Sequence, residues 1–561
     1  MTRRIVRAPP LGALVALLGC GSSPSTSTTT TTTSGDAGSG ASTGSGGAGG
    51  AGGSAPVCVS VPVPTGPPFT DETAALGIDF QRHQTANFCD MPGEIGGGAC
   101  VFDFDGDGDL DLYFTDRAPG PNRLYRNDGA TFTDVTDASG AGTKSDTMGC
   151  LAFDFDGDGD GDLDLDLDLY LANAGPDQIL RNDGGNFTDV TAAVGLEEDG
   201  LSASVTVGDI DGDGDLDLAV AHYVDPATCA QECPPNPEKC APLRSLLFEN
   251  QNGHFTEVGV ARGITAKEPT LAILLVDFDL DGDLDLYLGN DLPAYPDRLF
   301  VNDGTGHFVD QAPELGLAWD ATGSGSYTMG VAVADYNRDG VLDVASTNFE
   351  GLPTLLFPCH QGPVCVDSHL EGMDIDSGIP FTSWGIGLVD FDHNGRLDLF
   401  TASGLINGKD QTAQRNQLYR NGVGGFKEYL PAPGEALSVE RSSRGAVFGD
   451  LNGDGAVDVV VAANQGPPQV LFNRSSLGHY LTVDLGPGGA GAQVVVDVAG
   501  QKLLQQAVIG GSCLGSSDHR LSFGLGDACS ADVTVRWLDG KTKTLKAVAA
   551  DAVVKILPGG G

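Results

Sequence analysis

Seven short loops rich in Asp are the part of this sequence best suited to chemistry. The first reads DFDGDGDLD over residues 103–111, and related loops begin at Asp154, Asp209, Asp277, Asp335, Asp390 and Asp450. Carboxylates at positions 1, 3, 5 and 9 can surround one cation with hard oxygen ligands. Glycine at position 6 supplies the turn, and position 7 offers its backbone carbonyl. This pattern predicts calcium loops.

The candidate ligands follow the same positions in each loop, with one Asn in each of the last three. They are Asp103, Asp105, Asp107, Asp109 and Asp111; Asp154, Asp156, Asp158 and Asp162; Asp209, Asp211, Asp213 and Asp217; Asp277, Asp279, Asp281 and Asp285; Asp335, Asn337, Asp339 and Asp343; Asp390, Asp392, Asn394 and Asp398; and Asp450, Asn452, Asp454 and Asp458. An Asn keeps an oxygen ligand but removes a charge, so we expect weaker binding in those three loops.

The second loop is irregular, and its register stays open at this point. Extra Gly-Asp and Asp-Leu units lie between Asp154 and Leu169, so the ligand set could be shifted by two residues. We favour the set that ends at Asp162, because Phe153-Asp154-Phe155-Asp156 matches the start of the first loop.

EF-hand loops and plain acidic turns are the two alternatives for this pattern. An EF-hand needs an acidic residue at position 12 and flanking helices. Position 12 is occupied instead by Phe114, Leu165, Val220, Leu288, Ser346, Thr401 and Val461. Solvated turns would not repeat in register seven times, and carboxylates about 4 Å apart repel by about 4 kcal/mol per pair without a cation. We therefore expect up to seven structural Ca²⁺ ions whose binding is coupled to folding.

The elements around the loops predict how they are held. Each loop follows an apolar strand and leads into a second, such as LDLYF or VDVVV; several repeats add a third strand ending in Asn and a fourth resembling FTDV. Four strands per repeat is the unit of a β-propeller blade. The seventh repeat lacks its fourth strand, and an unassigned copy lies at residues 69–72. We predict an all-β chain with a seven-bladed propeller over residues 69–475, closed by this N-terminal strand.

Two family resemblances fit this organisation. The loops resemble FG-GAP/VCBS repeats, in which such a loop joins two strands of a blade and holds calcium. Residues 477–557, with Phe-Gly-Leu-Gly at 523–526 and Val-Arg-Trp at 535–537, look like the ASPIC/UnbV domain. That domain follows such repeats in the cartilage acidic protein family and its bacterial relatives. The loop at 486–491 is shorter than usual, and Cys513 stands where an aromatic residue is expected.

The N-terminal segment predicts export. Basic residues precede a short apolar run, and Leu17-Leu18-Gly19-Cys20 looks like a lipobox, which implies a signal peptide over residues 1–19 and a lipid on Cys20. An ordinary signal peptide is the alternative. A tether rich in Ser, Thr and Gly spans residues 20–68 and keeps the folded part away from the membrane. We expect lipid anchoring to the bacterial envelope, at the outer membrane or cell surface.

Twelve cysteines fit an oxidising compartment. Because Cys20 is assigned to lipid, at least one of the other eleven is free or pairs outside the chain. Local pairs to consider are Cys359–Cys365, Cys513–Cys529, and two of Cys229, Cys233 and Cys240.

The formal net charge of −47 argues against nucleic-acid binding and against electrostatic attachment to lipid. No GxSxG outside the tether, HExxH, Walker or CxxCH motif occurs, so we expect no enzyme. Seven residues, each six positions before a loop, should ring the channel mouth opposite the metal: Gly97, Met148, Ala203, Leu271, Met329, Trp384 and Arg444. Plain packing is the alternative role for these residues, but Met148, Met329, Trp384 and Arg444 together would form a candidate ligand face.

The sequence therefore predicts a calcium-binding surface protein for adhesion or protein interaction. A carbohydrate-binding propeller is the alternative, and a hydrolase or lyase is a third hypothesis. The expected partner is an extracellular protein or a glycan, with the membrane reached only through the lipid.

Overall fold

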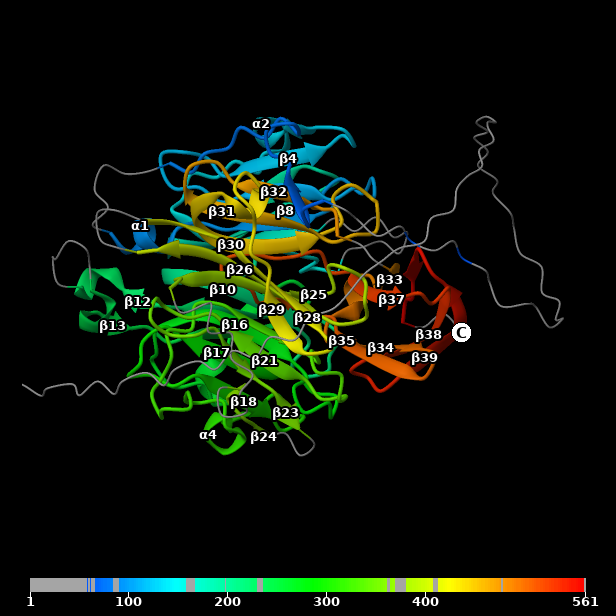
Figure 1. Ribbon diagram of the computed structural model, residues 1–561. Coiled ribbons are helices and arrows are strands. Elements are labelled where there is room, and N and C mark those ends of the chain that lie inside the picture. Colours follow the sequence, from blue (N-terminus) through cyan, green and yellow to red (C-terminus); the bar gives the residue numbers. More distant parts are fainter. Residues whose placement is uncertain are drawn as a thin grey trace, which may run out of the picture. The chain divides into compact units, whose positions relative to one another are not determined.

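A computed structural model describes residues 58, 61, 66–83, 90–157, 167–196, 198–229, 236–360, 364–368, 380–406, 412–475 and 478–558 (Figure 1). They belong to one compact unit, Pro56–Gly561. The predicted signal peptide, Cys20 and nearly all of the tether lie outside the described residues.

Antiparallel strands with buried apolar residues form each repeat. Repeats one to three contain β2 (Ala99–Phe102), β3 (Asp111–Phe114), β4 (Arg123–Asn127) and β5 (Phe132–Asp134); β6 (Thr147–Phe153), β7 (Asp168–Pro176), β8 (Gln178–Asn182) and β9 (Phe187–Asp189); and β10 (Asp199–Gly208), β11 (Asp217–His222), β14 (Leu246–Asn250) and β15 (Phe255–Glu257). Repeats four and five contain β16 (Thr270–Val276), β17 (Asp285–Asn290), β18 (Arg298–Asn302) and β19 (Phe308–Asp310); and β20 (Val331–Ala334), β21 (Asp343–Ser346) and β22 (Leu355–Phe357), followed by the hairpin β23 (Cys359–His360) and β24 (Val364–Cys365). Repeats six and seven contain β25 (Ser383–Val389), β26 (Asp398–Leu405), β28 (Gln417–Gly422) and β29 (Gly425–Glu428); and β30 (Glu440–Gly449), β31 (Asp458–Gln465), β32 (Gln469–Asn473) and β1 (Phe69–Asp71).

Short elements connect these sheets. They are β12 (Val224–Asp225), β13 (Ala241–Pro242) and β27 (Thr412–Arg415), the helices α1 (Met91–Ile95), α2 (Thr136–Ser139), α3 (Gly259–Arg262) and α4 (Ala312–Leu315), and the 3₁₀ turns at 226–228, 237–239 and 436–438. Helices α2, α3 and α4 each follow a fourth strand and end at a left-handed glycine, which stops the helix within about one turn.

The inner strands close a ring. In the described part of the chain, β2, β6, β10, β16, β20, β25 and β30 contact one another in this order, and β30 contacts β2 again. Strand β1 pairs antiparallel with β32, with Phe69 opposite Asn473, so the N-terminal strand completes the last sheet as predicted. The all-β propeller arrangement expected from the sequence is confirmed.

Burial falls from the inside of the ring outward. Strands β2 and β3 are buried along their whole length, whereas β5 buries only Phe132 and exposes its other two residues. Apolar side chains of neighbouring sheets fill the space between them; Val447 and Val460 of repeat seven, for example, pack with Val101 and Leu112 of repeat one. Because one sheet cannot bury both of its faces, the repeats depend on their neighbours for stability.

A second β-rich region follows the ring. One sheet joins β37 (Leu521–Gly526), β33 (His479–Asp484) and β40 (Ala552–Lys555), and the other joins β35 (Gln501–Gln506), β34 (Gln493–Val498), β38 (Ser530–Arg536) and β39 (Thr542–Ala549). A 3₁₀ turn at 487–489 and the short β36 (Ile509–Gly510) complete the region. The two sheets share one apolar core that includes Leu481, Val494, Val533 and Trp537. In Figure 1 this region is orange to red.

Residues 509–518 of this region enter the ring, and we call them the plug segment. Strand β36 pairs antiparallel with β10, and Ser516 forms backbone hydrogen bonds of 3.0 and 3.2 Å with Val101 and Ala99. The backbone N–H of Asp518 donates to the carbonyl of Phe448 at 2.9 Å. Inner strands of repeats one, three and seven therefore use the plug segment as a hydrogen-bonding partner for their channel-facing edges.

The plug segment lies very close to the inner strands. A Cβ atom added to Gly98 would lie 1.4 Å from the carbonyl oxygen of Leu514, so only glycine fits there. Leu514 and Cys513 are fully buried. No sequence pattern signals this insertion, because the contacts join segments that lie far apart in the chain, such as Gly98 and Leu514.

Four disulfides lie in the described residues: Cys58–Cys529, Cys100–Cys150, Cys229–Cys240 and Cys359–Cys365. The predicted pair Cys359–Cys365 is confirmed, as is a pair within the Cys229 group. The predicted Cys513–Cys529 pair is wrong. Cys529 bonds to Cys58, and Cys513 is a free, buried thiol because the plug segment carries it into the ring.

Candidate functional site

Each Asp-rich loop is shaped by hydrogen bonds to its first carboxylate. In loop one, the N–H groups of Gly106 and Gly108 donate to the two carboxylate oxygens of Asp103 at 2.9 and 2.8 Å. Both glycines have left-handed backbones, with φ of 72° and 93°. The bond from position 6 to position 1 recurs in loops three to seven. Glycine recurs at position 6 because this residue must adopt a left-handed backbone to donate its N–H to the first carboxylate.

Position 4 is also left-handed in all seven loops, which the sequence did not reveal. Four loops have glycine there, but loops four, five and six have Leu280, Arg338 and His393, with φ of 63°, 65° and 57°. A non-glycine residue in this region costs about 1 kcal/mol or more. These three loops are therefore held in shape by their surroundings as well as by local preference.

The carboxylate at position 9 connects each loop to the sheet. It is the first residue of the second strand and is almost fully buried, as in Asp111. One oxygen accepts the N–H of position 2, and the other accepts the N–H of the residue that ends or follows the third strand; in loop one these donors are Phe104 at 3.0 Å and Asn127 at 2.7 Å. The same pair of bonds recurs in loops two, three, four, five and seven.

The Asn that ends the third strand joins neighbouring repeats. Its side-chain N–H donates to the carbonyl at position 2 of the preceding repeat's loop, and in five cases also to position 8 of its own loop. We call these residues the Asn clasps: Asn127, Asn182, Asn250, Asn302, Asn421 and Asn473. The sequence showed this Asn in several repeats but not what it bonds to, because the acceptor lies in another repeat.

Five of the loops bring three carboxylates together. Oxygen atoms within 4.8 Å of one another come from Asp103, Asp105 and Asp111; Asp154, Asp156 and Asp168; Asp209, Asp211 and Asp217; Asp277, Asp279 and Asp281; and Asp390, Asp392 and Asp398. Loops five and seven have an Asn at position 3, so an amide replaces one acid of the set. In loop one, Asp107 and Asp109 are exposed and lie outside the carboxylate cluster.

Loop two corrects a prediction. Asp168 begins β7, accepts the N–H groups of Phe155 and Asn182, and completes the carboxylate cluster. The assignment of position 9 to Asp162 is therefore wrong, because the strand that must follow the loop begins six residues later. Asp158 and Asp162 lie outside the described residues.

Several oxygens in these clusters have no hydrogen-bond donor. They are Oδ1 of Asp211, Oδ1 of Asp277, Oδ1 of Asp392 and Oδ2 of Asp398. Burial, with a smaller effect from neighbouring carboxylates, raises the pKa of Asp111, Asp168 and Asp217 to about 8. Grouped, unpartnered carboxylate oxygens fit a hard cation such as Ca²⁺, which would supply the missing charge.

Loops four and six also contact the C-terminal region. Gln493 donates to Oδ2 of Asp277 at 2.7 Å, and Arg536 donates to the carbonyl of Leu280 at 3.1 Å. His393 is buried, accepts the N–H of Gly526 at 2.9 Å through its carbonyl, and packs beside Tyr480. The geometry of these two loops is therefore linked to the position of the C-terminal region.

The predicted ligand face is closed. Met148, Met329, Trp384 and Arg444 do come together, but each is at most 1 % exposed. Cys513 and Leu514 of the plug segment and Met91 and Ile95 of α1 pack against them. The four residues form a core, so the prediction of an open face is corrected.

Arg444 shows how this core is satisfied. Its guanidinium lies 4.3 Å from the ring centre of Trp384 and donates to the carbonyls of Glu94, Gly404 and Ser443. Burial lowers the pKa of Arg444 to about 9. Replacing Trp384 or Arg444 with alanine is therefore expected to destabilise the ring. A residue that only bound a ligand would not have this effect on stability.

Family comparisons agree with the two-part organisation. The FG-GAP-like repeat description matches residues 103–163, 160–220, 277–346 and 390–461, and the ASPIC and UnbV description matches residues 486–561. Among the described residues, no helix is long and apolar enough to cross a membrane.

Curated relatives include cartilage acidic protein 1 of Homo sapiens and of Mus musculus, both 28% identical over 47% of this chain. The match covers 40% and 41% of those proteins, so the chain spans well under half of their length.

Solved structures give weaker likenesses. The exotype rhamnogalacturonan lyase YesX is similar at 12% identity over 68% of this chain and 72% of its own, with a TM-score of 0.36. YCF48 from Cyanidioschyzon merolae is similar at 10% identity over 69% of this chain and 98% of its own, with a TM-score of 0.37.

The repeats, the ring that they form and the C-terminal match lead to one assignment. The chain belongs to the family of proteins in which FG-GAP-like repeats are followed by a C-terminal ASPIC and UnbV domain.

Proposed function

We propose that this protein is an exported interaction module whose ring is stabilised by Ca²⁺ in the repeated loops. The observation that carries the calcium assignment is the group of carboxylate oxygens without donors in loops three, four and six. Buried anionic oxygens with no partner are costly, and a divalent cation offsets that cost. Oxygen-only ligands in a short glycine-containing turn favour Ca²⁺ over transition metals.

The cations would act structurally. Positions 1 and 3 lie in the loop, while position 9 begins the second strand and accepts an N–H from the third. A cation held by these positions would fix the loop relative to two strands, and the Asn clasp extends this link to the neighbouring repeat. Loops four and six would in addition hold the C-terminal region in place through Gln493 and His393.

Calcium titration of the full mature chain tests this proposal. Chain stripped with EDTA and titrated with Ca²⁺ should bind several ions by native mass spectrometry and calorimetry, up to seven. Its melting temperature should rise by roughly 10 °C or more at saturation, because a ligand that binds only the folded state stabilises it. Binding of Mg²⁺ at equal strength, or an unchanged melting temperature, would contradict the proposal.

The location and the partner are part of the same proposal. Cys20 would carry the lipid, and the ring would bind an extracellular protein through its outer surface, since α1 and the plug segment fill its central core. Mass spectrometry of the N-terminal peptide tests whether Cys20 carries a lipid.

A pull-down tests the partner. The tagged mature chain is used to capture proteins from the envelope of the same organism, with and without EDTA. Recovery of the same proteins in both samples would argue against calcium-dependent binding.

A further inference from the structure

Repeat five departs from the pattern of the Asn clasps. Its third strand, β22, ends at Phe357, and Cys359 occupies the position that Asn holds in the other six repeats. The N–H of Cys359 still donates to Oδ1 of Asp343 at 2.8 Å, as the Asn N–H does elsewhere. A cysteine has no side-chain amide, so it cannot supply the bonds that reach the preceding loop.

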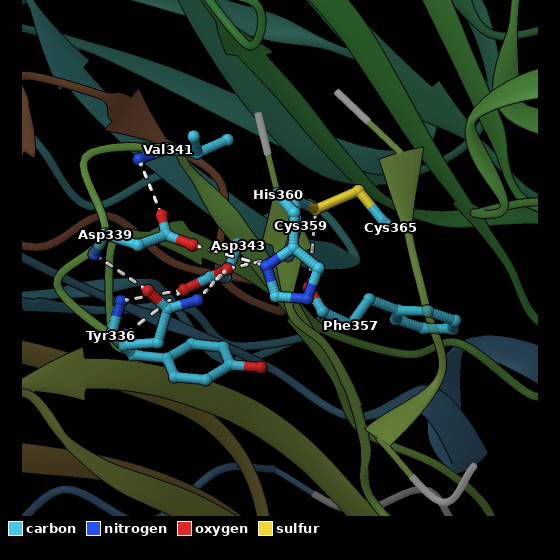
Figure 2. Close-up of a disulfide and its surroundings, with 9 residues drawn as sticks. Tyr336, Asp339, Val341, Asp343, Phe357, Cys359, His360 and Cys365 are labelled. Atoms are coloured by element: carbon cyan, nitrogen blue, oxygen red, sulfur yellow. Dashed lines mark hydrogen bonds and ion pairs between the residues drawn. A yellow bond between two sulfur atoms is a disulfide. The ribbon is translucent and has the colours of Figure 1, made fainter. Parts of the chain in front are cut away.

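A disulfide lies where those bonds would be. Cys359 pairs with Cys365 across the β23–β24 hairpin, and the two Cα atoms are 4.0 Å apart (Figure 2). Both cysteines are buried, at 0 and 3 % exposure.

The disulfide packs in the seam between repeats four and five. Its cysteines share an apolar cluster with Phe278 of loop four and with Ala312 and Leu317 at α4. A Cβ atom on Gly316 would lie 2.3 Å from the carbonyl oxygen of Cys365. The Asn clasps bridge the same kind of seam in the other repeats, so the disulfide occupies the equivalent place.

The residue after Cys359 also contacts the loop. Nδ1 of His360 lies 3.4 Å from Oδ2 of Asp339, and Asp339 accepts the N–H of Val341 at 3.0 Å. Figure 2 shows Asp339 and Asp343 on the side of the loop that faces the strand carrying Cys359 and His360. Two of the proposed loop-five ligands are thus held by the segment that the disulfide closes.

We propose that the Cys359–Cys365 disulfide replaces the Asn clasp and makes cation binding in loop five sensitive to redox state. This inference rests on the proposed binding of Ca²⁺ by the loops. In the oxidised chain the hairpin holds the N–H of Cys359 against Asp343. In the reduced chain that segment is free to move. Asp343 then loses the N–H of Cys359 and keeps only the donors that lie within the loop, Tyr336 and Asn337.

A dithiol reductant can supply the two electrons that reduce the Cys359–Cys365 disulfide. One thiolate of the dithiol attacks a sulfur of the Cys359–Cys365 bond, which gives a mixed disulfide and releases the other cysteine as a thiol. The second thiolate of the dithiol then displaces the first cysteine. Two electrons pass to Cys359 and Cys365, which end as two thiols, and the dithiol becomes a cyclic disulfide.

Three variants of the full mature chain separate this role from general stability. Cys359→Ser with Cys365→Ser removes the disulfide and offers no amide. Cys359→Asn with Cys365→Ser removes the disulfide but restores the residue found in the other repeats. Cys229→Ser with Cys240→Ser removes a different local disulfide and serves as the control.

Tyr336 provides a signal specific to loop five. It is the residue at position 2, where the other loops have Phe104, Phe155, Ile210, Phe278, Phe391 and Leu451. Tb³⁺ bound in loop five should be sensitised by this tyrosine. Subtracting the emission of the Tyr336→Phe chain isolates that site, and native mass spectrometry with Ca²⁺ counts the ions independently.

The variant with Cys359→Ser and Cys365→Ser should bind Tb³⁺ in loop five about tenfold more weakly than the unaltered chain. At a Ca²⁺ concentration that only partly saturates the sites, it should also hold one Ca²⁺ fewer. The asparagine variant and the control should bind as the unaltered chain does. Dithiothreitol under native conditions should lower the loop-five Tb³⁺ emission of the unaltered chain but not that of the asparagine variant. This comparison does not use the serine variant, so it tests the inference even if that variant fails to fold. Equal loop-five binding in all chains would overturn the inference, whereas absence of Ca²⁺ from the unaltered chain would overturn the proposed function instead.

Discussion

The side-chain amide of Asn127 donates a hydrogen bond of 2.9 Å to the carbonyl oxygen of Leu451, which lies 324 positions later in the chain. Leu451 is position 2 of loop seven, and Asn127 ends the third strand of repeat one. This bond therefore joins the first repeat to the last. It closes the ring in addition to the pairing of β1 with β32, which completes the last repeat. The same contact between neighbouring repeats recurs at the other five Asn clasps.

Replacing Asn127 with alanine should lower stability by roughly 3 kcal/mol. The amide is 2 % exposed and also donates to Leu110, so its loss leaves two buried carbonyls without this donor. Urea unfolding measures the change. Asn186→Ala is the control, because Asn186 is exposed and bonds only within its own turn. Equal stability of the two variants would contradict the clasp.

Replacing Asp105 with alanine should remove one Ca²⁺ site, with binding to loop one weakened by about a hundredfold. Asp105 belongs to the carboxylate cluster of this loop. Asp109→Ala is a matched control, because Asp109 is also an exposed aspartate of loop one but lies outside the cluster. Native mass spectrometry counts the ions in each chain. Loss of an ion from the Asp109 variant as well would show that charge, and not ligation, decides binding.

Replacing Gly98 with alanine should displace the plug segment and destabilise the whole chain by about 3 kcal/mol or more. The added Cβ would lie 1.4 Å from the backbone oxygen of Leu514, which cannot rotate away. Limited proteolysis should then cut the chain between the ring and the C-terminal region. Gly422→Ala is the control, since no atom lies within 4 Å of its added Cβ. Unchanged protease resistance of the Gly98 variant would disprove the tight insertion.

Replacing Glu94 with glutamine should change how stability depends on pH. Burial raises the pKa of Glu94 from 4.5 to about 7, although nearby Arg444 lowers it in part. A carboxyl whose folded pKa is raised stabilises the fold below the unfolded value and loses that contribution as the pH rises towards 7. The variant should therefore match the unaltered chain near pH 4 and be more stable by about 1–3 kcal/mol at pH 8.

Thermal melts of both chains across this range measure the difference. A constant difference at every pH would show that Glu94 does not titrate in this window.

The sequence alone determined the repeat and its local structure. Glycine at position 6 marks a left-handed turn, and alternating apolar residues mark the strands on either side of each loop; both depend on neighbours within a few residues. The strand at residues 69–71 could be assigned to repeat seven because that repeat lacked its own fourth strand. The local pair Cys359–Cys365 was predictable for the same reason of short separation.

Only the tertiary structure decided what fills the ring and what joins its repeats. Leu514 meets Gly98, and Trp384 and Arg444 become core residues, because the plug segment arrives from the C-terminal region. Position 9 of loop two is Asp168, since the start of β7, and not residue spacing, fixes which carboxylate returns to the cluster. Asn127 finds its acceptor in Leu451 only once the ring has closed. Such contacts depend on the packing of distant segments, and no pattern of neighbouring residues specifies them.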